Sequence, residues 1–209
     1  MRQDKETRNK LLQSAREEFM EKGYMKASLR NICRNAGVTT GALYFFFEDK
    51  ADLFEAITKE TVDGIYQIMQ EHYRMERVWA EGGMPDGQME DEHTADETAY
   101  KQIIHHMYLH RDEILLVLTK SQGSNMENIL DKFIETSEEH YRVMAAQMQL
   151  AHPGKIIDDR FVHWLAHMQI DAFVYMITHI EKEEEAFQFL NQAVTYMIMG
   201  WYGLFADKN

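Results

Sequence analysis

Apolar residues recur every three to four positions along most of the chain, which is the spacing of an amphipathic helix. No segment shows the alternation of apolar and polar residues that is typical of a half-buried strand. The chain has only two prolines, Pro85 and Pro153, so helix-breaking positions are rare. We therefore expect an all-α protein of about nine helices, with a three-helix domain at residues 1–48 and a larger helical bundle at residues 49–209.

Glycines and capping residues define the expected boundaries of the first helices. Gly23 and Gly37 are placed to end the first two helices, because glycine readily adopts the left-handed conformation found at helix C-termini. Ser28, Thr39 and Asp49 are placed to cap the next three helices through their side-chain oxygens. We expect the third helix to end near residue 45 and the fourth near residue 79.

A loop is expected after the fourth helix. Residues 81–97 contain three glycines, one proline and seven acidic residues but no lysine or arginine, a composition typical of a loop. The helical pattern then resumes, and we place further helices near residues 98–110, 112–121, 125–151, 158–182 and 184–206.

The net charge of −13 argues at first sight against a nucleic-acid-binding protein, because binding to phosphates requires positive charge. The distribution of the charge changes this interpretation. Residues 1–50 hold ten Lys and Arg against seven Asp and Glu, a net of +3, whereas residues 51–209 hold twelve against twenty-eight, a net of −16. A basic N-terminal segment on an acidic body can present one face to DNA while the body is repelled.

The stretch from Ser28 to Phe54 carries the strongest motif. Two short helices joined by a glycine turn form a rigid bracket, which lets the second helix enter the major groove. The stretch resembles the DNA-binding domain of the TetR family in its Ala-Gly-Val turn, its Gly-x-Leu-Tyr helix and its Phe-x-x-Lys-x-x-Leu entry into the fourth helix. The resemblance covers roughly the first 55 residues. It implies a TetR-like fold and a homodimeric, ligand-responsive transcriptional regulator, most simply a repressor released from a palindromic operator.

The resemblance also implies roles for individual residues. It places Thr39, Thr40 and Gly41 at the start of the recognition helix, near base edges and phosphates. It assigns phosphate contacts to the phenol of Tyr44 and to the ammonium of Lys50. Arg30 and Arg34 lie on the exposed face of the second helix, where they either reach the DNA backbone or stay solvated. The expected DNA-binding set is Ser28, Thr39, Thr40, Gly41, Tyr44, Phe45 and Lys50.

Phe45 departs from the pattern of many TetR relatives, which carry a His or another polar residue there. One interpretation is that its ring packs on a thymine methyl group and favours an A·T pair at that step. The other is that Phe45, Phe46 and Phe47 are all core residues. Both stay open at this point.

The last two expected helices are apolar on more than one side, so each needs two partners. One partner is the core, and the other is the matching surface of a second subunit related by a two-fold axis. The alternative is that both helices lie deep in a monomeric core. The expected dimer interface comprises Phe161, Leu165, Met168, Ala172, Ala193, Met197 and Gly200.

The larger domain also offers an expected ligand pocket. Fifteen methionines and ten tyrosines suit an adaptable apolar site with a few directed hydrogen bonds, although such residues more often form core. We expect a small apolar or amphipathic effector, with cations favoured if Glu127, Glu138 and Glu139 face the pocket rather than solvent. The expected lining is Tyr66, Met69, Tyr73, Tyr100, Ile104, Met107, Tyr108, Phe133, Tyr141 and Met144.

Histidines at helical spacing raise the question of a metal. His163, His167 and Asp171 fall on one helix face, and His106 and His110 form a second pair with the same spacing. Without a cysteine partner we expect them to line the pocket or the dimer interface, and we expect no metal or cofactor.

Two functions other than a regulator remain as alternatives. The first is a helical metal-dependent hydrolase or oxygenase built on the histidine pairs, and the second is an adaptor with a degenerate helix-turn-helix. The sequence has no glycine-rich phosphate loop and no signature of an activated Ser or Cys, so we do not expect an enzyme.

Three further features bear on location. Residues 1–10 are nearly all polar and no apolar segment follows them, as a secretory signal would require. The longest nearly apolar run, at residues 193–206, is shorter than the roughly 20 residues that cross a bilayer. Cys33 is the only cysteine, so an intramolecular disulfide is excluded. We therefore expect a cytoplasmic protein that does not enter a membrane.

Overall fold

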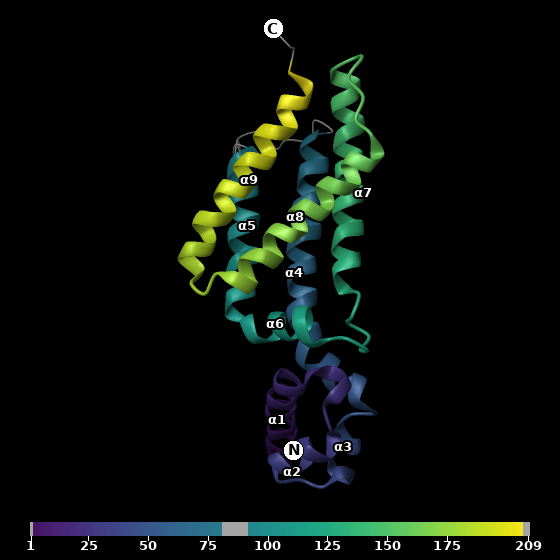
Figure 1. Ribbon diagram of the computed structural model, residues 1–209, viewed down its shortest axis with the longest axis vertical. Helices are drawn as coiled ribbons and strands as arrows, with labels where there is room; N and C mark the ends of the chain where they lie inside the picture. The colour runs from purple at the N-terminus through teal and green to yellow at the C-terminus, as the bar shows by residue number, and fades with distance from the viewer. Residues whose placement is uncertain (1, 81–91, 207–209) are drawn as a thin grey trace. The chain divides into compact units, whose positions relative to one another are not determined.

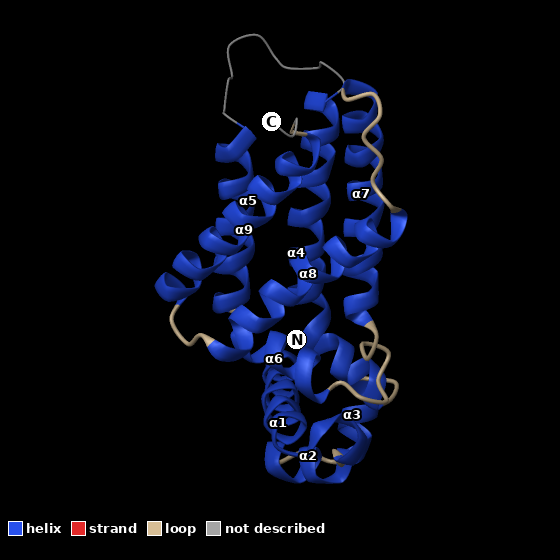
Figure 2. Ribbon diagram, turned by 45° about the horizontal axis from the view of Figure 1, so that its top comes forward, coloured by secondary structure: helices blue, strands red, loops and turns tan. Residues whose placement is uncertain are grey.

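The computed structural model describes residues 2–80 and 92–206, and within these ranges it contains nine α-helices and no strand (Figures 1 and 2). The all-α prediction of about nine helices is therefore confirmed. The helices are α1 (Arg2–Lys26), α2 (Leu29–Ala36), α3 (Thr40–Phe46), α4 (Lys50–Ala80), α5 (Glu92–Leu109), α6 (Arg111–Lys120), α7 (Ile129–Ala151), α8 (Asp159–His179) and α9 (Glu183–Phe205).

Most expected boundaries agree with these bounds to within a few residues, and two differ in kind. The first helix does not end at Gly23 but continues to Lys26 across a kink, where Gly23 has φ 72° and ψ 160°. The loop expected at residues 81–97 lies partly outside the described residues, and its last part belongs to α5. No glycine or proline occurs between residues 88 and 122, so nothing in the backbone prevents this earlier start.

The chain divides into two compact units. The first comprises Met1–Gly64 with His110–Ile129, and the second comprises Ile65–Leu109 with Leu130–Asn209. The first unit thus contains the segment expected as a DNA-binding domain, residues 1–48, and adds α6 and the first half of α4. Helix α4 contributes residues to both units.

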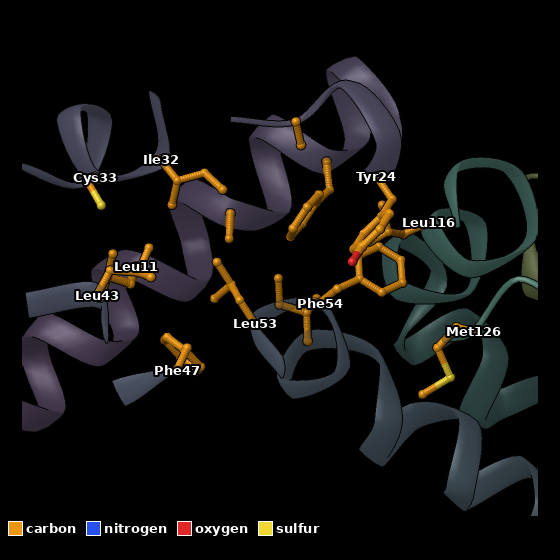
Figure 3. Packing of buried hydrophobic residues seen from close by; sticks show 14 residues of the cluster. Leu11, Tyr24, Ile32, Cys33, Leu43, Phe47, Leu53, Phe54, Leu116 and Met126 are labelled. Carbon is orange, nitrogen blue, oxygen red and sulfur yellow. The ribbon is translucent and has the colours of Figure 1, made fainter. Parts of the chain in front are cut away.

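An aromatic and aliphatic core holds the first unit together. Figure 3 shows side chains of α1, α2, α3, α4 and α6 pointing into it. Phe19 and Phe54 are fully buried and meet edge to face with ring centroids 5.0 Å apart. Tyr24 packs against Phe54 at 5.2 Å, and Leu116 of α6 is fully buried in the same cluster. The core therefore needs a helix from far along the chain, which the periodicity of residues 1–48 did not indicate.

Side-chain caps begin α3 and α4 as expected. The hydroxyl of Thr39 accepts a hydrogen bond from the Ala42 amide at 3.2 Å. The Asp49 carboxylate accepts from the Asp52 amide at 2.8 Å, and the Asp52 carboxylate accepts from the Glu48 amide at 2.9 Å. Both capping predictions are confirmed, and each cap pairs an amide that the helix itself leaves unpaired.

Ser28 lies at the predicted N-cap position of α2, but the prediction that its side chain caps the helix is wrong. Ser28 occupies the N-cap position of α2 with extended backbone, but its side chain makes no capping hydrogen bond. Instead the buried Glu18 of α1 accepts from the Ser28 amide at 3.1 Å and from the Asn31 side chain at 3.3 Å. A carboxylate at a helix N-terminus also complements the helix dipole, so Glu18 replaces the serine as the cap.

The second unit consists of the end of α4 with α5, α7, α8 and α9. Helix α9 packs against both α5 and α8 (Figure 1). A cluster of apolar side chains from α7, α8 and α9 includes Ala145, Val162, Leu165, Trp201 and Phe205. Among the described helices, none combines the length and the apolar character needed to cross a membrane.

Candidate functional site

Helices α2 and α3 form the bracket expected of a helix-turn-helix. Gly37 ends α2 in the left-handed conformation, with φ 69° and ψ 31°, and its amide donates to the carbonyl of Arg34 at 3.2 Å. The buried hydroxyl of Ser14 in α1 donates to the carbonyl of Ile32 at 2.9 Å. Because Ile32 and Leu43 are both fully buried, α1 fixes the angle between the two short helices.

The opposite face of α3 is open. Thr39, Thr40 and Gly41 are exposed at its start. Tyr44 and Phe45 follow on the helix, and 59% and 75% of their surfaces are exposed. The structure thus brings five members of the expected DNA-binding set onto one short helix and its cap.

The exposure of Phe45 excludes one of the two interpretations of the phenylalanine run. Phe47 is buried, Phe46 is half-buried and Phe45 is exposed, so the interpretation that all three are core residues is wrong. The rings of Phe45 and Phe46 meet edge to face at 4.9 Å. This contact supports the exposed ring from one side and leaves the rest of it accessible.

Lys50 has partners that the sequence analysis missed. Its ammonium donates to the Tyr24 carbonyl at 2.8 Å and to the Met25 carbonyl at 3.3 Å, and it lies 4.5 Å from the centroid of the Tyr24 ring. The ammonium therefore caps the C-terminal end of α1, and only the third of its three protons is left for a phosphate. A lysine in the first turn of a helix is disfavoured by the dipole of that helix. The position of Lys50 in the sequence therefore already indicates that its ammonium has a partner outside α4.

The remaining basic candidates lie on α2. Arg30 and Arg34 are both exposed, and Ser28 at the start of α2 is half-buried. Positive charge is therefore available beside α3, and no side-chain hydrogen bond or ion pair among the described residues holds these two arginines in place.

The expected pocket residues separate into two groups in the second unit. One cavity of about 60 Å³ is lined by Tyr73, Tyr100, Tyr141 and Met144 among others. A neighbouring cleft of about 570 Å³ between α5 and α9 is lined by Tyr100 and Ile104 together with Glu97, Lys101, Phe187, Gln188, Leu190, Asn191, Val194, Thr195 and Ile198.

The other expected pocket residues line neither of these two cavities. Tyr66 packs edge to face on Phe133 at 5.7 Å. Met69, Met107 and Phe133 are buried, and the phenol of Tyr108 donates to the Ile180 carbonyl at 2.9 Å. These residues support the fold of the second unit, as expected if they form core rather than a pocket.

A buried polar cluster borders the small cavity. The phenol of Tyr73 lies 3.0 Å from the Ser137 hydroxyl and donates to Gln169 Oε1 at 3.0 Å. Its ring stacks on His140, with centroids 4.0 Å apart and planes at 3°. His140 Nε2 lies 2.7 Å from Glu76 Oε2, and His72 Nε2 lies 3.7 Å from the other oxygen of this carboxylate.

Helical spacing contained the signal for this cluster. Met69, Tyr73 and Glu76 follow one another at steps of four and three, as do Ser137, His140 and Met144 at steps of three and four. Polar residues in such positions face the interior together with the apolar ones. The aromatic and sulfur-containing members of this face are expected from the sequence, whereas the polar members between them are not among the expected pocket residues.

The acids expected to favour a cationic ligand face elsewhere. Glu138 pairs with Arg142 and, at 2.8 Å, with His163. Glu127 accepts from the Gly123 amide at 2.9 Å, and Glu139 is exposed. None of these three carboxylates lines the two cavities, so they do not favour a cation there.

The histidine pairs form no recognisable metal centre. The rings of His163 and His167 lie 4.6 Å apart, and the Nδ1 atom of His163 faces Glu138. Within residues 2–80 and 92–206, no group of three or more His, Cys, Asp and Glu side chains is arranged to hold a metal ion.

The expected dimer residues are covered to different degrees within one chain. Leu165 is buried in the cluster of the second unit, and both Leu165 and Met197 line the small cavity. Gly200 is exposed, and Phe161, Met168, Ala172, Ala193 and Met197 are half-buried. Large exposed side chains that the sequence analysis did not name lie on α8 and α9, namely Trp164, Tyr175, Tyr196, Met199, Tyr202 and Leu204.

Comparison with known proteins gives independent information about the N-terminal region. Residues 11–57 match the family described as bacterial regulatory proteins, tetR family. The chain is 48% identical over 52 residues to the transcriptional repressor BepR of Brucella suis, which is 25% of this chain and 25% of BepR. It is 39% identical over 67 residues to the transcriptional regulator AcrR of Shigella flexneri, which is 32% of this chain and 31% of AcrR. The similarity therefore spans about a quarter to a third of these relatives.

Similarity of fold extends over nearly the whole chain. The structure resembles NalD of Pseudomonas aeruginosa with a TM-score of 0.57 and 21% identity, over 93% of this chain and 97% of NalD. It resembles a transcriptional regulator from Aquifex aeolicus with a TM-score of 0.56 and 18% identity, over 91% of this chain and 99% of the other. Residues 11–57 are therefore similar to the DNA-binding segment of the tetR family of bacterial regulatory proteins, and the chain as a whole shares its all-helical fold with these solved regulators.

Proposed function

We propose that this protein is a DNA-binding transcriptional regulator, and specifically a repressor that a small-molecule effector releases from a palindromic operator. The observation that carries the proposal is the open face of α3, where Thr39, Thr40, Tyr44 and Phe45 are exposed while Leu43 is fully buried. A short helix with one anchored and one accessible face suits insertion into a major groove. The relatives are named as regulators rather than as enzymes, which supports this proposal over a catalytic one.

The side chains of α3 fall into those that contact bases and those that contact phosphates. The hydroxyl of Thr40 at the start of the helix is of the type that reads base edges. The phenol of Tyr44 and the third ammonium proton of Lys50 donate to phosphate oxygens, which positions the helix without selecting sequence. The exposed ring of Phe45 offers an apolar surface for a thymine methyl group.

A homodimer follows from the limited reach of one recognition helix. One seven-residue helix contacts only a few base pairs, and a second copy about 34 Å away doubles the contacts on a palindrome. The exposed aromatic and methionine side chains of α8 and α9 are of the kind that subunits bury, and we take them together as one apolar face. We propose that this face, rather than the buried Leu165, forms the centre of the interface.

Effector control needs only modest energies. An effector that prefers one conformation of the dimer tenfold over another shifts DNA affinity by about 1.4 kcal/mol. The cavities lined by Tyr73, Tyr100 and Ile104 are the proposed binding region. Tyr73 and Lys50 lie on the same helix, α4. A movement of α4 caused by a ligand at Tyr73 would therefore also move residues of the DNA-binding unit.

Selection of bound fragments from random double-stranded DNA tests the proposal directly. We expect an inverted repeat, with binding that weakens steeply as salt increases. Replacement of Thr40 is expected to change the selected sequence, whereas Tyr44→Phe is expected to weaken binding to every sequence alike. If the purified protein binds no duplex at low ionic strength, the proposed function is refuted.

A further inference from the structure

Two side chains that line the small cavity of the second unit each hold a buried nitrogen atom without a hydrogen-bond partner. The two atoms are Nε1 of Trp201 and Nδ1 of His140, and the statement holds for partners among the residues that the structure describes. The two side chains are 7% and 3% exposed, and both line the cavity of about 60 Å³. Leaving a buried donor unpaired is costly, so two such atoms around one cavity indicate a bound group.

Two other polar groups around this cavity already have partners. The phenol of Tyr73 hydrogen-bonds with Ser137 and Gln169. The carboxylate of Glu76 forms ion pairs with His140 and His72, although its Oε2 atom makes no hydrogen bond within the described residues. Because Glu76 already has imidazole partners inside the protein, a ligand need not supply a partner for it. A charged ligand would have to break or outweigh this pair in a site of low polarity.

The two unpaired nitrogens specify the chemistry of the bound group. The indole N–H of Trp201 is a donor only, so the group must accept a hydrogen bond. His140 presents Nε2 to Glu76, so its Nδ1 is an acceptor when the ring is neutral and a donor when it is charged. A hydroxyl group accepts from the indole and either donates to or accepts from the imidazole. An ammonium has no acceptor for the indole, and a carboxylate would bring a second negative charge to a cavity that Glu76 already lines.

The adjoining cleft indicates what the rest of the ligand is like. The cleft of about 570 Å³ between α5 and α9 shares Tyr100, Val194 and Ile198 with the small cavity. Its lining includes Ile104, Phe187 and Leu190, and its volume lies within the usual range for small-molecule sites. An apolar chain or ring of the ligand fits there while a compact polar end reaches the cavity.

We propose that the second unit binds a neutral amphipathic molecule by its hydroxyl group, which bonds to Trp201 Nε1 and His140 Nδ1 while its apolar body occupies the cleft between α5 and α9. The assignment rests on the proposed function only in treating this molecule as the effector. The ligand class is a phenol or an alcohol with an apolar tail.

Titration calorimetry of the full-length protein with matched probes tests this chemistry without DNA. The probes are 4-hexylphenol and its methyl ether, 4-hexylanisole, which has the same apolar body and no hydroxyl proton. We expect the phenol to bind about tenfold more tightly than the ether, because the ether cannot donate to His140 and its methyl group crowds the cavity. Equal affinities would indicate that a water molecule satisfies the two nitrogens, and would overturn the proposal.

Trp201→Phe removes the indole donor and keeps an aromatic ring. This variant is expected to lose most of the preference for the phenol over the ether, to within about twofold. Tyr66→Phe is the matched control, because it also removes a hydrogen-bonding group from an aromatic ring of the second unit and Tyr66 lines neither cavity. A Trp201→Phe variant that keeps the full preference would refute the role of the indole.

A measurement on the wild-type protein tests the same hydrogen bond without requiring that Trp201→Phe folds. The indole proton of Trp201 is expected to shift downfield in proton–nitrogen correlation spectra when the phenol binds, and to shift less with the ether. No shift of this resonance on phenol binding would contradict the proposal. If the phenol binds and the affinity for the operator does not change, the ligand site is supported and effector control is refuted. If the protein binds the operator but not the phenol, the ligand site is refuted and the proposed regulator function stands.

Discussion

The ammonium of Lys50 lies 2.8 Å from the carbonyl oxygen of Tyr24 and joins the first turn of α4 to the C-terminal end of α1. This end of α1 is the segment beyond the kink at Gly23, and Lys50 also contacts the Met25 carbonyl and the face of the Tyr24 ring. A lysine that resembles a phosphate ligand in sequence is therefore also a structural element of the first unit.

Replacing Lys50 by methionine keeps the aliphatic stem and removes the charged hydrogen bonds. We expect Lys50→Met to lower the free energy of unfolding by about 1–2 kcal/mol, because the carbonyls at the end of α1 lose their cap. Urea unfolding followed by circular dichroism measures the loss. Lys59→Met is the control, since Lys59 forms an exposed ion pair with Glu55 on α4 and little change is expected. A Lys50→Met protein as stable as the wild type would show that the cap contributes nothing.

Two neighbouring phenylalanines on and beside α3 should respond to truncation in opposite ways. Phe47→Ala removes a buried ring and is expected to cost about 3–5 kcal/mol of stability. Phe45→Ala removes a ring that is 75% exposed, so thermal unfolding should hardly change. The DNA sequences selected by Phe45→Ala should lose a preference for A·T at one position of each half-site. An unchanged selected motif would remove Phe45 from the set of base-reading residues.

The start of α2 offers a test of which side chain is the cap. Ser28→Ala is expected to change stability by less than about 0.5 kcal/mol, because the serine side chain makes no capping bond. Glu18→Ala is expected to cost about 1–3 kcal/mol, because it leaves the Ser28 amide and the Asn31 side chain without their acceptor. Chemical denaturation of the two variants side by side measures the difference. The reverse order of stabilities would restore the serine as the cap.

These cases explain how far the sequence predicted the structure. Helices α2 and α3 were placed correctly because their signals are local, with Gly37 and Thr39 acting on residues a few positions away. The role of α6 was missed because Leu116 enters the core of the first unit from a distant part of the chain, and nothing in the periodicity of α6 names its partner. The sequence placed this helix with the larger domain for the same reason.

The polar cluster of the second unit shows a different limit. The spacing of Tyr73, Glu76 and His140 contained the information that these side chains face inward. Burial of acids and histidines is rare unless they are paired, and the pairing of Glu76 with His140 joins α4 to α7. A pair between helices is set by tertiary packing, so only the structure could identify it.

The N-terminus of α8 has a carboxylate with a perturbed pKa. The guanidinium of Arg160 hydrogen-bonds to Asp158, and together with the Arg160 amide it lowers the pKa of this carboxyl from 3.8 to about 2. Since the folded-state pKa is the lower one, the interaction stabilises the protein above about pH 4 and is lost as the pH falls through about 2. Nuclear magnetic resonance titration should show that Arg160→Ala raises the pKa of Asp158 toward 3.8. An Asp158 that titrates normally in the wild-type protein would contradict the contact.

Tyr196 on α9 provides the sharpest test of the proposed dimer. Its side chain is 72% exposed within one chain, so Tyr196→Glu should leave the helical content and the thermal unfolding of the subunit almost intact. Burying the new carboxylate against the apolar face of a second subunit is costly, so sedimentation analysis should detect monomers at concentrations where the wild type is a dimer. Leu150→Glu is the matched control, because Leu150 is 83% exposed on α7 and lies outside the proposed interface. DNA affinity should fall together with dimerisation, since one α3 then binds alone. A Tyr196→Glu protein that remains dimeric would place the interface on another surface.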